Sequence, residues 1–375
     1  MTSIDLLENL TNLLTYFTAF IALILIIVFI HEFGHYIVAK KFGVKIEVFS
    51  IGFGKKILSR TDKSGTNWQL GILPFGGYVK MFGDSNEASG KDELLLQKMS
   101  EEQKKSAFHY KPLYQKALIV AAGPAFNFIL AIILLNIIFA IYGKISSLPT
   151  ISTVINPSPA YSAGLKPKDK FISIDDEKVE SFSDIQRIIA LNTGKEVNIK
   201  IERDKKVIDI NLTPKLTEQT DPFGNKIKTP ILGITSNEIS YQKLSLPQAF
   251  IESFKQTYEI SGTTLKALKQ MITGQRSIKE ITGPIGIAQY SGQAAKQGFL
   301  SFFWLVIFIS INLGLVNLFP IPVLDGGHLL YYIIEAIKGE AIADTYQQLG
   351  MKIGMLIIVL LSVFAILNDI RKFFI

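Results

Sequence analysis

Two histidines and a glutamate with the spacing of a metal site occur near the N-terminus, in the segment His31-Glu32-Phe33-Gly34-His35. On a helix, histidines four residues apart lie on one face, about 6 Å from each other, so both imidazoles can bind one metal ion. The glutamate between them is placed to take a proton from a water molecule at the metal. The pattern therefore predicts metal-assisted hydrolysis of a peptide bond.

The sequence around this motif is apolar. Residues 13–30 form a run of eighteen uncharged, mostly apolar residues that leads into it, and a run of this length is a candidate transmembrane helix. Ionisable side chains at membrane depth are costly and usually functional. We therefore expect the metal site to lie inside the bilayer. A purely structural role would place His31, Glu32 and His35 beside lipid without a function that offsets the cost of burying them.

The composition indicates a membrane protein with a water-exposed part. Of the 375 residues, 48% are hydrophobic, which is high for a soluble protein but low for a bundle of membrane helices alone. The chain has no cysteine, which excludes a cysteine nucleophile, thiolate ligands and disulfides. A metal must then be held by histidine and carboxylate groups. Much of the net charge of +7 follows the first apolar run, so we expect no nucleic-acid partner.

Four apolar segments predict four transmembrane helices, and the charges around the first one predict their orientation. Before it stand Asp5 and Glu8 but no lysine or arginine, unlike the basic start of a secretory signal. Basic residues gather after it, which places the N-terminus outside, the loop 40–116 in the cytoplasm and residues 144–300 outside. The predicted spans are residues 13–39, 117–142, 302–318 and 353–367.

Residues 41–82 predict a β-hairpin or small sheet, because apolar residues alternate on both sides of a turn at residues 62–65. The apolar stretch 74–79 leaves two interpretations open. The hairpin is either a small soluble feature or one that dips back toward the metal and offers a strand edge to an extended peptide. His109, later in the same loop, is expected to be an ordinary surface histidine.

The second predicted span begins Gly123-Pro124-Ala125-Phe126-Asn127. Glycine allows close approach of another helix, and proline kinks a helix. Asn127 is expected to face the interior of the bundle, where a packing role is at least as plausible as a catalytic one.

Residues 148–215 have the pattern of a separate α+β domain. Short strands and turns lead to an amphipathic helix at residues 184–191, and a hairpin over residues 197–212 closes the pattern. The order and spacing resemble a circularly permuted bacterial PDZ domain, a module that binds an extended peptide by edge pairing. A spacer or size filter that binds no particular peptide is equally compatible.

A helix is predicted over about residues 246–272, where Ser245 and Gln248 form a capping-box signature. Its apolar positions suit a helix lying in the membrane interface. Packing against the external domain is the alternative.

Two histidines leave a zinc site incomplete, because catalytic zinc usually has three protein ligands and a water. The third span is followed by Pro320 and Pro322, which break the helix, and then by Asp325 and His328. These residues are expected at the membrane depth of the histidine motif. On the residues alone, the third ligand is either a carboxylate or a histidine.

Together these motifs resemble the site-2 protease family of intramembrane zinc metalloproteases, in its bacterial sigma-E-protease (RseP) type. The matching features are the His31 to His35 motif, the segment from Asn317 to Gly326, the Gly52-Phe53-Gly54 hairpin, the Gly123 to Asn127 segment and the PDZ-like insertion. One PDZ-like domain stands here where the best-known members have two. The resemblance implies Zn²⁺ as cofactor, with His31, His35 and Asp325 as ligands, His328 as the fallback, Glu32 as general base and Asn317 in contact with substrate.

The same resemblance implies a zinc metalloendopeptidase (EC 3.4.24.-) that cleaves peptide bonds within or next to the transmembrane segments of single-pass membrane proteins. Anti-sigma factors, in regulated intramembrane proteolysis, and remnant signal peptides are the implied substrates. The implied location is the bacterial cytoplasmic (inner) membrane, as a multi-pass protein in contact with lipid. The PDZ-like domain is then on the periplasmic side, with a peptide as its potential ligand.

The predicted fold is a polytopic α-helical membrane protein with about four transmembrane helices, a membrane-associated β-hairpin and an inserted α+β PDZ domain. Its predicted domains are the first half of the protease core at 1–143, the PDZ-like domain at 144–240, and an interfacial helix with the second half of the core at 241–375. A membrane-anchored scaffold with a dead metal site is disfavoured because Glu32 and Asp325 are both present. A metal transporter is disfavoured because no inverted repeat is found.

Overall fold

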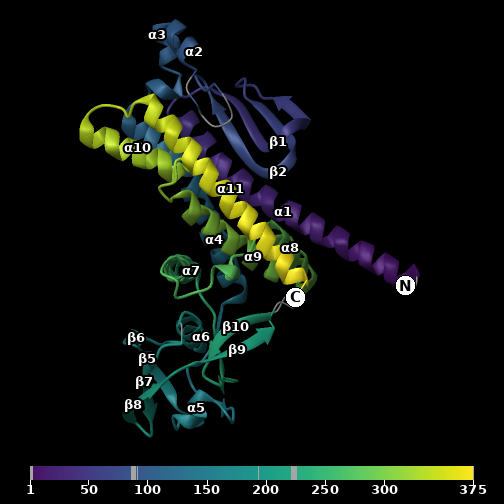
Figure 1. The fold of residues 1–375 in the computed structure, drawn as a ribbon, viewed down its shortest axis with the longest axis vertical. Helices are drawn as coiled ribbons and strands as arrows, with labels where there is room; N and C mark the ends of the chain where they lie inside the picture. The colour runs from purple at the N-terminus through teal and green to yellow at the C-terminus, as the bar shows by residue number, and fades with distance from the viewer. Residues whose placement is uncertain (1–2, 86–89, 91, 193, 221–225, 375) are drawn as a thin grey trace. The chain divides into compact units, whose positions relative to one another are not determined.

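The computed structural model describes residues 3–85, 90, 92–192, 194–220 and 226–374 (Figure 1). The chain forms two compact units, one of residues 1–134 with 281–375 and one of residues 135–280. The first contains long apolar helices and a β-hairpin. The second contains a small α+β domain and one long helix.

Four helices of the described chain are long and apolar enough to cross a membrane. Each overlaps one of the predicted spans almost completely. A helix is expected there because it satisfies its own backbone groups where no water is present. The predicted polytopic helical fold is confirmed. The four helices are α1 (Ser3–Lys41), α4 (Leu113–Tyr142), α9 (Phe299–Asn317) and α11 (Asp344–Phe374).

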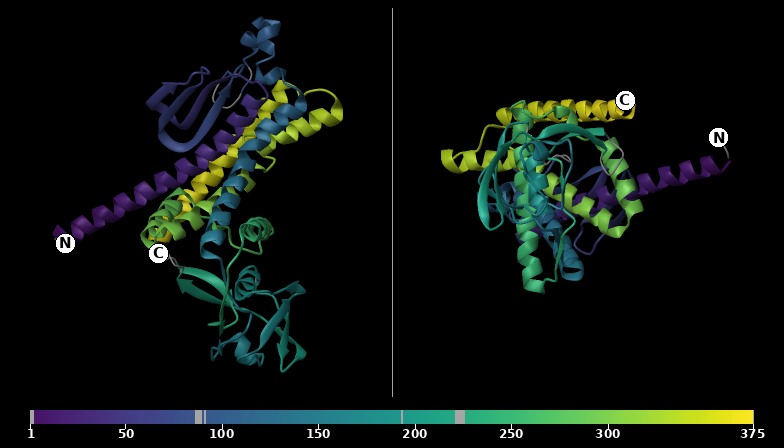
Figure 2. Two further views of the ribbon diagram at one scale, coloured as in Figure 1. Left: turned by 180° about the vertical axis from the view of Figure 1, so that it is seen from behind. Right: turned by 90° about the horizontal axis from the view of Figure 1, so that it is seen from below.

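The predicted hairpin is a strongly bent ribbon that lies against the C-terminal half of α1 (Figure 2). Its strands β1 (Ile46–Thr61) and β2 (Asn67–Met81) pair antiparallel with several register shifts. Because both strands bend, the pairing forms a sheet of four short segments. In order across the sheet, these are residues 77–81, 46–51, 67–70 and 56–61.

A hydrophobic cluster fixes the hairpin to α1. Tyr36 and Ala39 of α1 are buried together with Phe49 of β1 and Val79 of β2. The rings of Tyr36 and Phe49 meet edge to face with their centroids 5.6 Å apart. Full burial of a large apolar side chain contributes about 1.5–3 kcal/mol. The hairpin is therefore anchored to the helix that carries the metal motif.

One long-range cap joins the C-terminal helix to the rest of the first unit. α8 (Pro284–Gln297) begins at Gly283, which has no capping side chain. The buried carboxylate of Asp369 in α11 accepts the N–H groups of Gly283 and Gly286, both at 2.9 Å. These donors would otherwise lack a partner at the start of a helix. The shorter helices of this unit are α2 (Glu93–Lys98), α3 (Glu101–Lys104), η1 (Phe108–Tyr110) and α10 (Asp325–Lys338).

The prediction that His109 is an ordinary surface histidine is wrong. Its Nε2 lies 2.9 Å from Oδ1 of Asp84, and the Asp84 side chain is fully buried. Asp84 also accepts the N–H of Met81 at 2.8 Å. A buried carboxylate requires such partners, and the sequence does not show them because 25 positions separate the two side chains.

The second unit contains the predicted inserted domain, with the PDZ-type order of strands and helices. Its main sheet has the strand order β6-β5-β7-β8, and β4 pairs with β11. Its core is aliphatic and includes Ile174, Ile185 and Ile199. The elements in chain order are β3 (Lys144–Ser147), β4 (Thr153–Val154), α5 (Pro159–Ser162), β5 (Lys170–Ile174), β6 (Glu177–Lys178), α6 (Phe182–Ala190), β7 (Val197–Arg203), β8 (Lys206–Leu212), β9 (Lys215–Thr220), β10 (Lys226–Ile231), β11 (Ile234–Thr235) and β12 (Ile239–Gln242).

The chain enters and leaves this domain through a two-stranded stem. β3 begins two residues after α4 ends at Tyr142, and it pairs antiparallel with β12. Lys144 lies opposite Gln242 in this pairing. The start of the domain and the approach to the next long helix are therefore held together next to the end of α4.

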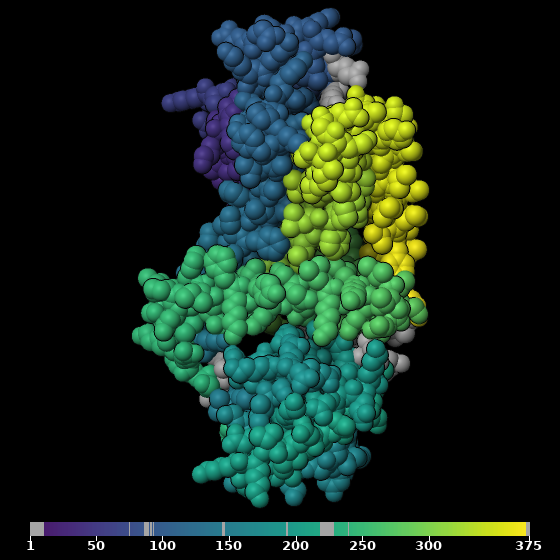
Figure 3. Space-filling model, turned by 90° about the vertical axis from the view of Figure 1, so that its left-hand side faces the viewer, coloured from purple at the N-terminus to yellow at the C-terminus, as the bar shows by residue number. Residues whose placement is uncertain are grey.

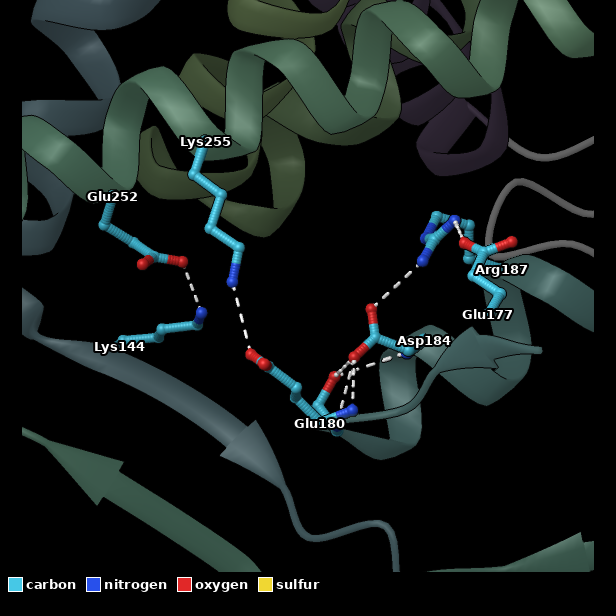
Figure 4. Close-up of polar contacts among 8 residues, drawn as sticks. Lys144, Glu177, Glu180, Asp184, Arg187, Glu252 and Lys255 are labelled. Carbon is cyan, nitrogen blue, oxygen red and sulfur yellow. Dashed lines mark hydrogen bonds and ion pairs between the residues drawn. The ribbon is translucent and has the colours of Figure 1, made fainter. Parts of the chain in front are cut away.

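That next helix, α7 (Leu246–Ile272), has the predicted capping box and attaches to the PDZ-type domain through long polar side chains. Glu252 pairs with Lys144 of β3, and Lys255 Nζ lies 3.3 Å from Glu180 (Figure 4). The ammonium groups of Lys178 and Lys255 hold the pKa of Glu180 below its ordinary value. Packing against the domain, one of the two predicted alternatives, is thus present in the structure.

A second face of α7 is apolar and exposed. Phe250, Phe254, Tyr258, Leu265 and Ile272 are all exposed, and their spacing places them on one stripe of the helix. In Figure 3, α7 is the green band that crosses the view directly above the PDZ-type domain, in teal. The helix therefore has two faces of different chemistry, one polar and in contact with the domain, the other apolar and exposed within the described part of the chain. Its location in the membrane interface stays a prediction.

Candidate metal centre

α1 brings His31 and His35 to one face, as their spacing requires. The ring centroids are 5.0 Å apart, and the two Nε2 atoms are 3.3 Å apart. Both residues are buried. They lie within Thr11–Lys41, the part of α1 that could cross a membrane.

Asp325 reaches the same point from the opposite end of the chain. After α9, the segment with Pro320 and Pro322 leads into α10, whose first residue is Asp325. Its carboxylate oxygens lie 3.2 Å from His31 Nε2 and 3.5 Å from His35 Nε2. The donor atoms of the three side chains all lie within 4.8 Å of one another.

Two glycines allow α10 to begin close to the preceding loop. A Cβ at Gly326 would lie 2.3 Å from the carbonyl oxygens of Leu318 and Phe319. A Cβ at Gly327 would lie 2.3 Å from the carbonyl oxygen of Ile321. No side chain fits at these distances, so backbone contact between the loop and α10 determines where Asp325 lies.

The three donor atoms fit a zinc ion. With bonds of about 2.0–2.1 Å, neighbouring ligand atoms of a tetrahedral zinc site lie about 3.3–3.4 Å apart. The two Nε2 atoms are 3.3 Å apart here. Of the two carboxylate oxygens of Asp325, Oδ2 lies 3.2 Å from His31 Nε2 and Oδ1 lies 3.5 Å from His35 Nε2. Asp325 Oδ2 is buried and makes no hydrogen bond within the described residues, although it faces His31 Nε2. A cation between these atoms explains an arrangement that would otherwise leave buried acceptors unsatisfied.

α4 packs directly behind the two imidazoles. Ile119 O lies 2.9 Å from His35 Nδ1 and can accept its proton, which leaves Nε2 available as a ligand. A Cβ at Gly123 would lie 2.3 Å from His35 Nε2, and a Cβ at Gly34 would lie 2.3 Å from Ala122 O. Both glycines are therefore needed for the close approach of α1 and α4.

Asn127 faces the interior and contacts the metal motif. Its side chain is fully buried, and its Nδ2 lies 3.1 Å from His31 Nδ1. Its backbone carbonyl accepts a hydrogen bond from the hydroxyl of Ser310 in α9 at 2.9 Å. Three helices thus meet at this residue.

Glu32 is buried beside the two histidines and lies outside the group of potential ligands. β2 passes next to it, since a Cβ at Gly77 would lie 2.8 Å from Glu32 Cγ. Gly77 therefore leaves the space that this carboxylate occupies. Sequence reasoning missed this role, although a glycine pair within a strand pattern is a signal of close approach by another group.

Two further residues are predicted from the sequence, Asn317 as a substrate contact and His328 as the fallback ligand. Asn317 is the last residue of α9 and is half-buried. His328 is half-buried in the first turn of α10 and is not in the ligand group found among the described residues. Of the two candidates for a third ligand, the structure brings Asp325 to the histidines. The contact of Asn317 with substrate stays a prediction.

The sequence matches the model of peptidase family M50 over residues 19–361. The chain belongs to peptidase family M50. This is the zinc-dependent family of the site-2 proteases, so the resemblance seen in the motifs is confirmed, as is Zn²⁺ as the cofactor. The protein is accordingly an M50 metalloprotease with membrane helices.

The M50 protein is similar along most of its length to bacterial relatives. Proteins from Brucella suis and Agrobacterium fabrum carry the name of a zinc metalloprotease and are 42% and 40% identical over 352 and 350 residues, which cover 92% of this chain and 92% and 93% of theirs. Metalloprotease MmpA of Caulobacter vibrioides is 34% identical over 370 residues, covering 92% of this chain and 93% of its own.

Among solved structures, the PDZ domain of an SdrC-like protein from Listeria monocytogenes is 26% identical to the M50 protein. The match covers 24% of this chain and 85% of that one, with a TM-score of 0.19. The PDZ-type assignment of the inserted domain rests on its own strand order and helices.

Asp325→Asn should lower the zinc content of the purified protein well below one per chain, because the substitution replaces a charged ligand with a neutral amide of equal size. His328→Asn is the matched control and should keep zinc near one per chain. Metal analysis of both detergent-purified variants is the measurement. The reverse pattern would identify His328 as the third ligand.

Gly123→Ala should also lower zinc occupancy, although it removes no ligand, because the added methyl overlaps the His35 ring. Gly262→Ala in α7 is the control, since a Cβ there has no neighbour within 4 Å and alanine favours a helix. Unchanged zinc occupancy in Gly123→Ala would mean that α1 and α4 do not approach as closely as described.

Proposed function

We propose that this metalloprotease cleaves peptide bonds within or next to the transmembrane segments of single-pass membrane proteins, in the bacterial cytoplasmic membrane. One observation carries the proposal. The cluster of His31, His35 and Asp325, with Glu32 beside it, lies in a segment of α1 whose length and composition suit a membrane span. Such a site can reach peptide bonds that a soluble protease cannot.

In the proposed mechanism, His31, His35 and Asp325 hold the zinc ion. When bound, zinc lowers the pKa of a water molecule and polarises the peptide carbonyl. Glu32 accepts the proton of the attacking water and then donates a proton to the leaving amine. The burial of Glu32 keeps bulk water from competing for this role.

The bent hairpin is the proposed holder of the substrate. A helical peptide bond is shielded and hydrogen-bonded, so the substrate must first become extended. The segment 77–81 pairs with residues 46–51 on one side and lies at the edge of the sheet within the described register. At Gly77 this edge segment passes Glu32. An extended peptide that adds to this edge would lie near the metal, and Asn317 is the second proposed contact.

Apolar side chains near the bend of the two strands support a location of the hairpin in the membrane rather than in water. Ile57, Leu58, Ile72 and Leu73 are all more than half exposed. A hairpin immersed in water would have no reason to expose four large apolar side chains together. Of the two interpretations of this loop, the one in which it dips back toward the metal is therefore favoured.

The inserted domain is proposed to act on the periplasmic side, as the alternation of spans and the lysines after α1 predict. Gly123 lies beside the metal ligands, whereas Tyr142 ends α4. At 1.5 Å per residue, the helix between them is about 28 Å long. The apolar face of α7 is proposed to lie in the membrane interface. The domain then selects clients, such as already trimmed anti-sigma factors, without touching the zinc.

Glu32→Gln should abolish cleavage of a model transmembrane substrate but leave about one zinc per chain. Loss of a general base typically lowers a rate by about 10²–10⁴-fold, and Glu32 is not among the ligands. Product formation in detergent or liposomes and metal analysis are the two measurements. Near-native cleavage by this variant would refute the proposed mechanism.

Deleting residues 150–235, with a flexible linker across the β3–β12 stem, should preserve cleavage of a pre-trimmed substrate and increase cleavage of an untrimmed one. The reason is that no residue of the domain is proposed to reach the zinc. Paired assays of both substrates, with zinc content as the control, measure this. A zinc-loaded deletion variant that cuts neither substrate would show that the domain organises the catalytic core.

A further inference from the structure

We infer that Asn127 is a positioning residue whose side-chain oxygen accepts the Nδ1 proton of His31 and so fixes the ring for metal binding. The inference rests on the proposed role of His31 as a zinc ligand. It concerns a residue of α4 that holds no metal itself, and it follows from the hydrogen-bonding capacity of two buried side chains.

The tautomer of His31 is determined by what its Nε2 atom faces. Nε2 points to Asp325 Oδ2 at 3.2 Å and to His35 Nε2 at 3.3 Å. As a ligand, Nε2 must be unprotonated, so the single proton of a neutral imidazole is on Nδ1. His31 Nδ1 is therefore a donor and requires an acceptor.

The side chain next to Nδ1 is the amide of Asn127. Its nitrogen has a neighbour at hydrogen-bonding distance, but its oxygen has no hydrogen-bond partner within the described residues. The amide nitrogen lies 3.1 Å from Nδ1, which would place two donors against each other. The amide oxygen, Oδ1, is buried. Turning the planar amide by 180° exchanges the oxygen and the nitrogen. Oδ1 then accepts the Nδ1 proton, and the two donors no longer face each other.

The same helix supplies the corresponding acceptor for the other histidine. Ile119 O lies 2.9 Å from His35 Nδ1. Ile119 and Asn127 are eight residues apart on α4, with Gly123 midway between them against both rings. α4 thus orients both ligands, one through a backbone carbonyl and one through a side chain.

The position of Asn127 is itself fixed by a third helix. Its backbone carbonyl accepts the hydroxyl proton of Ser310 at 2.9 Å. Nearby, a Cβ at Gly314 would lie 3.2 Å from Pro124 O, so α9 packs closely on this part of α4. The acceptor is therefore held in place before any metal binds.

Two near-isosteric variants test the inference on the full-length, detergent-purified protein. Asn127→Asp keeps an oxygen acceptor and cannot donate from a nitrogen, whereas Asn127→Leu keeps the volume and loses the acceptor. Zinc affinity is measured by competition with a chelator. We expect Asn127→Leu to bind zinc about 10–100-fold more weakly, and Asn127→Asp to bind it as tightly as the unaltered protein or more tightly.

Three outcomes would overturn the inference. Equal losses in both variants would mean that the amide donates to His31, and no loss in Asn127→Leu would mean that Asn127 only fills space. In ¹⁵N NMR of the zinc-loaded protein, which has four histidines, a proton on His31 Nε2 instead of Nδ1 would also contradict it. His31→Ala separates the two proposals, because retention of zinc by that variant would refute the ligand assignment itself.

Discussion

The close approach of α1 to α4 is the constraint on which the site depends. Gly34 and Gly123 leave no room for a side chain between the helices, and this brings the Ile119 carbonyl and the Asn127 amide against the two imidazoles. A looser crossing would leave the rings free to rotate. With the rings fixed, their Nε2 atoms are 3.3 Å apart, a spacing that a single zinc ion can bridge.

The third candidate ligand comes from α10, whose first residue lies beside the two histidines. Asp325 stands at the beginning of α10, where Gly326 and Gly327 allow the helix to press on the loop before it. The site therefore depends on small residues at each point where backbones meet. Flexible side chains carry the chemistry, but glycines determine the distances between them. This explains how ionisable groups can be held in a fixed arrangement among apolar helices.

The hairpin and the inserted domain show two ways of attaching an element. The hairpin is fixed to α1 by buried aromatic and aliphatic side chains such as Phe49 and Val79. α7 meets the PDZ-type domain through long charged side chains such as Lys255, whose ion pair with Glu180 is about half exposed. Exposed ion pairs contribute about 0.2–1 kcal/mol. The first contact rests on buried apolar surface, whereas this ion pair of the second adds little to stability.

The sequence by itself determined what depends on neighbours along the chain. Apolar runs predicted the four spans, the alternation around a turn predicted the hairpin, and the i, i+4 spacing put His31 and His35 on one face. The tertiary structure decided what depends on packing between distant segments. It brought Asp325 rather than His328 to the histidines, placed Gly77 against Glu32, and paired His109 with a buried Asp84. Local periodicity is set by backbone geometry and can be read from one segment, whereas these contacts require two surfaces whose mutual fit no single segment encodes.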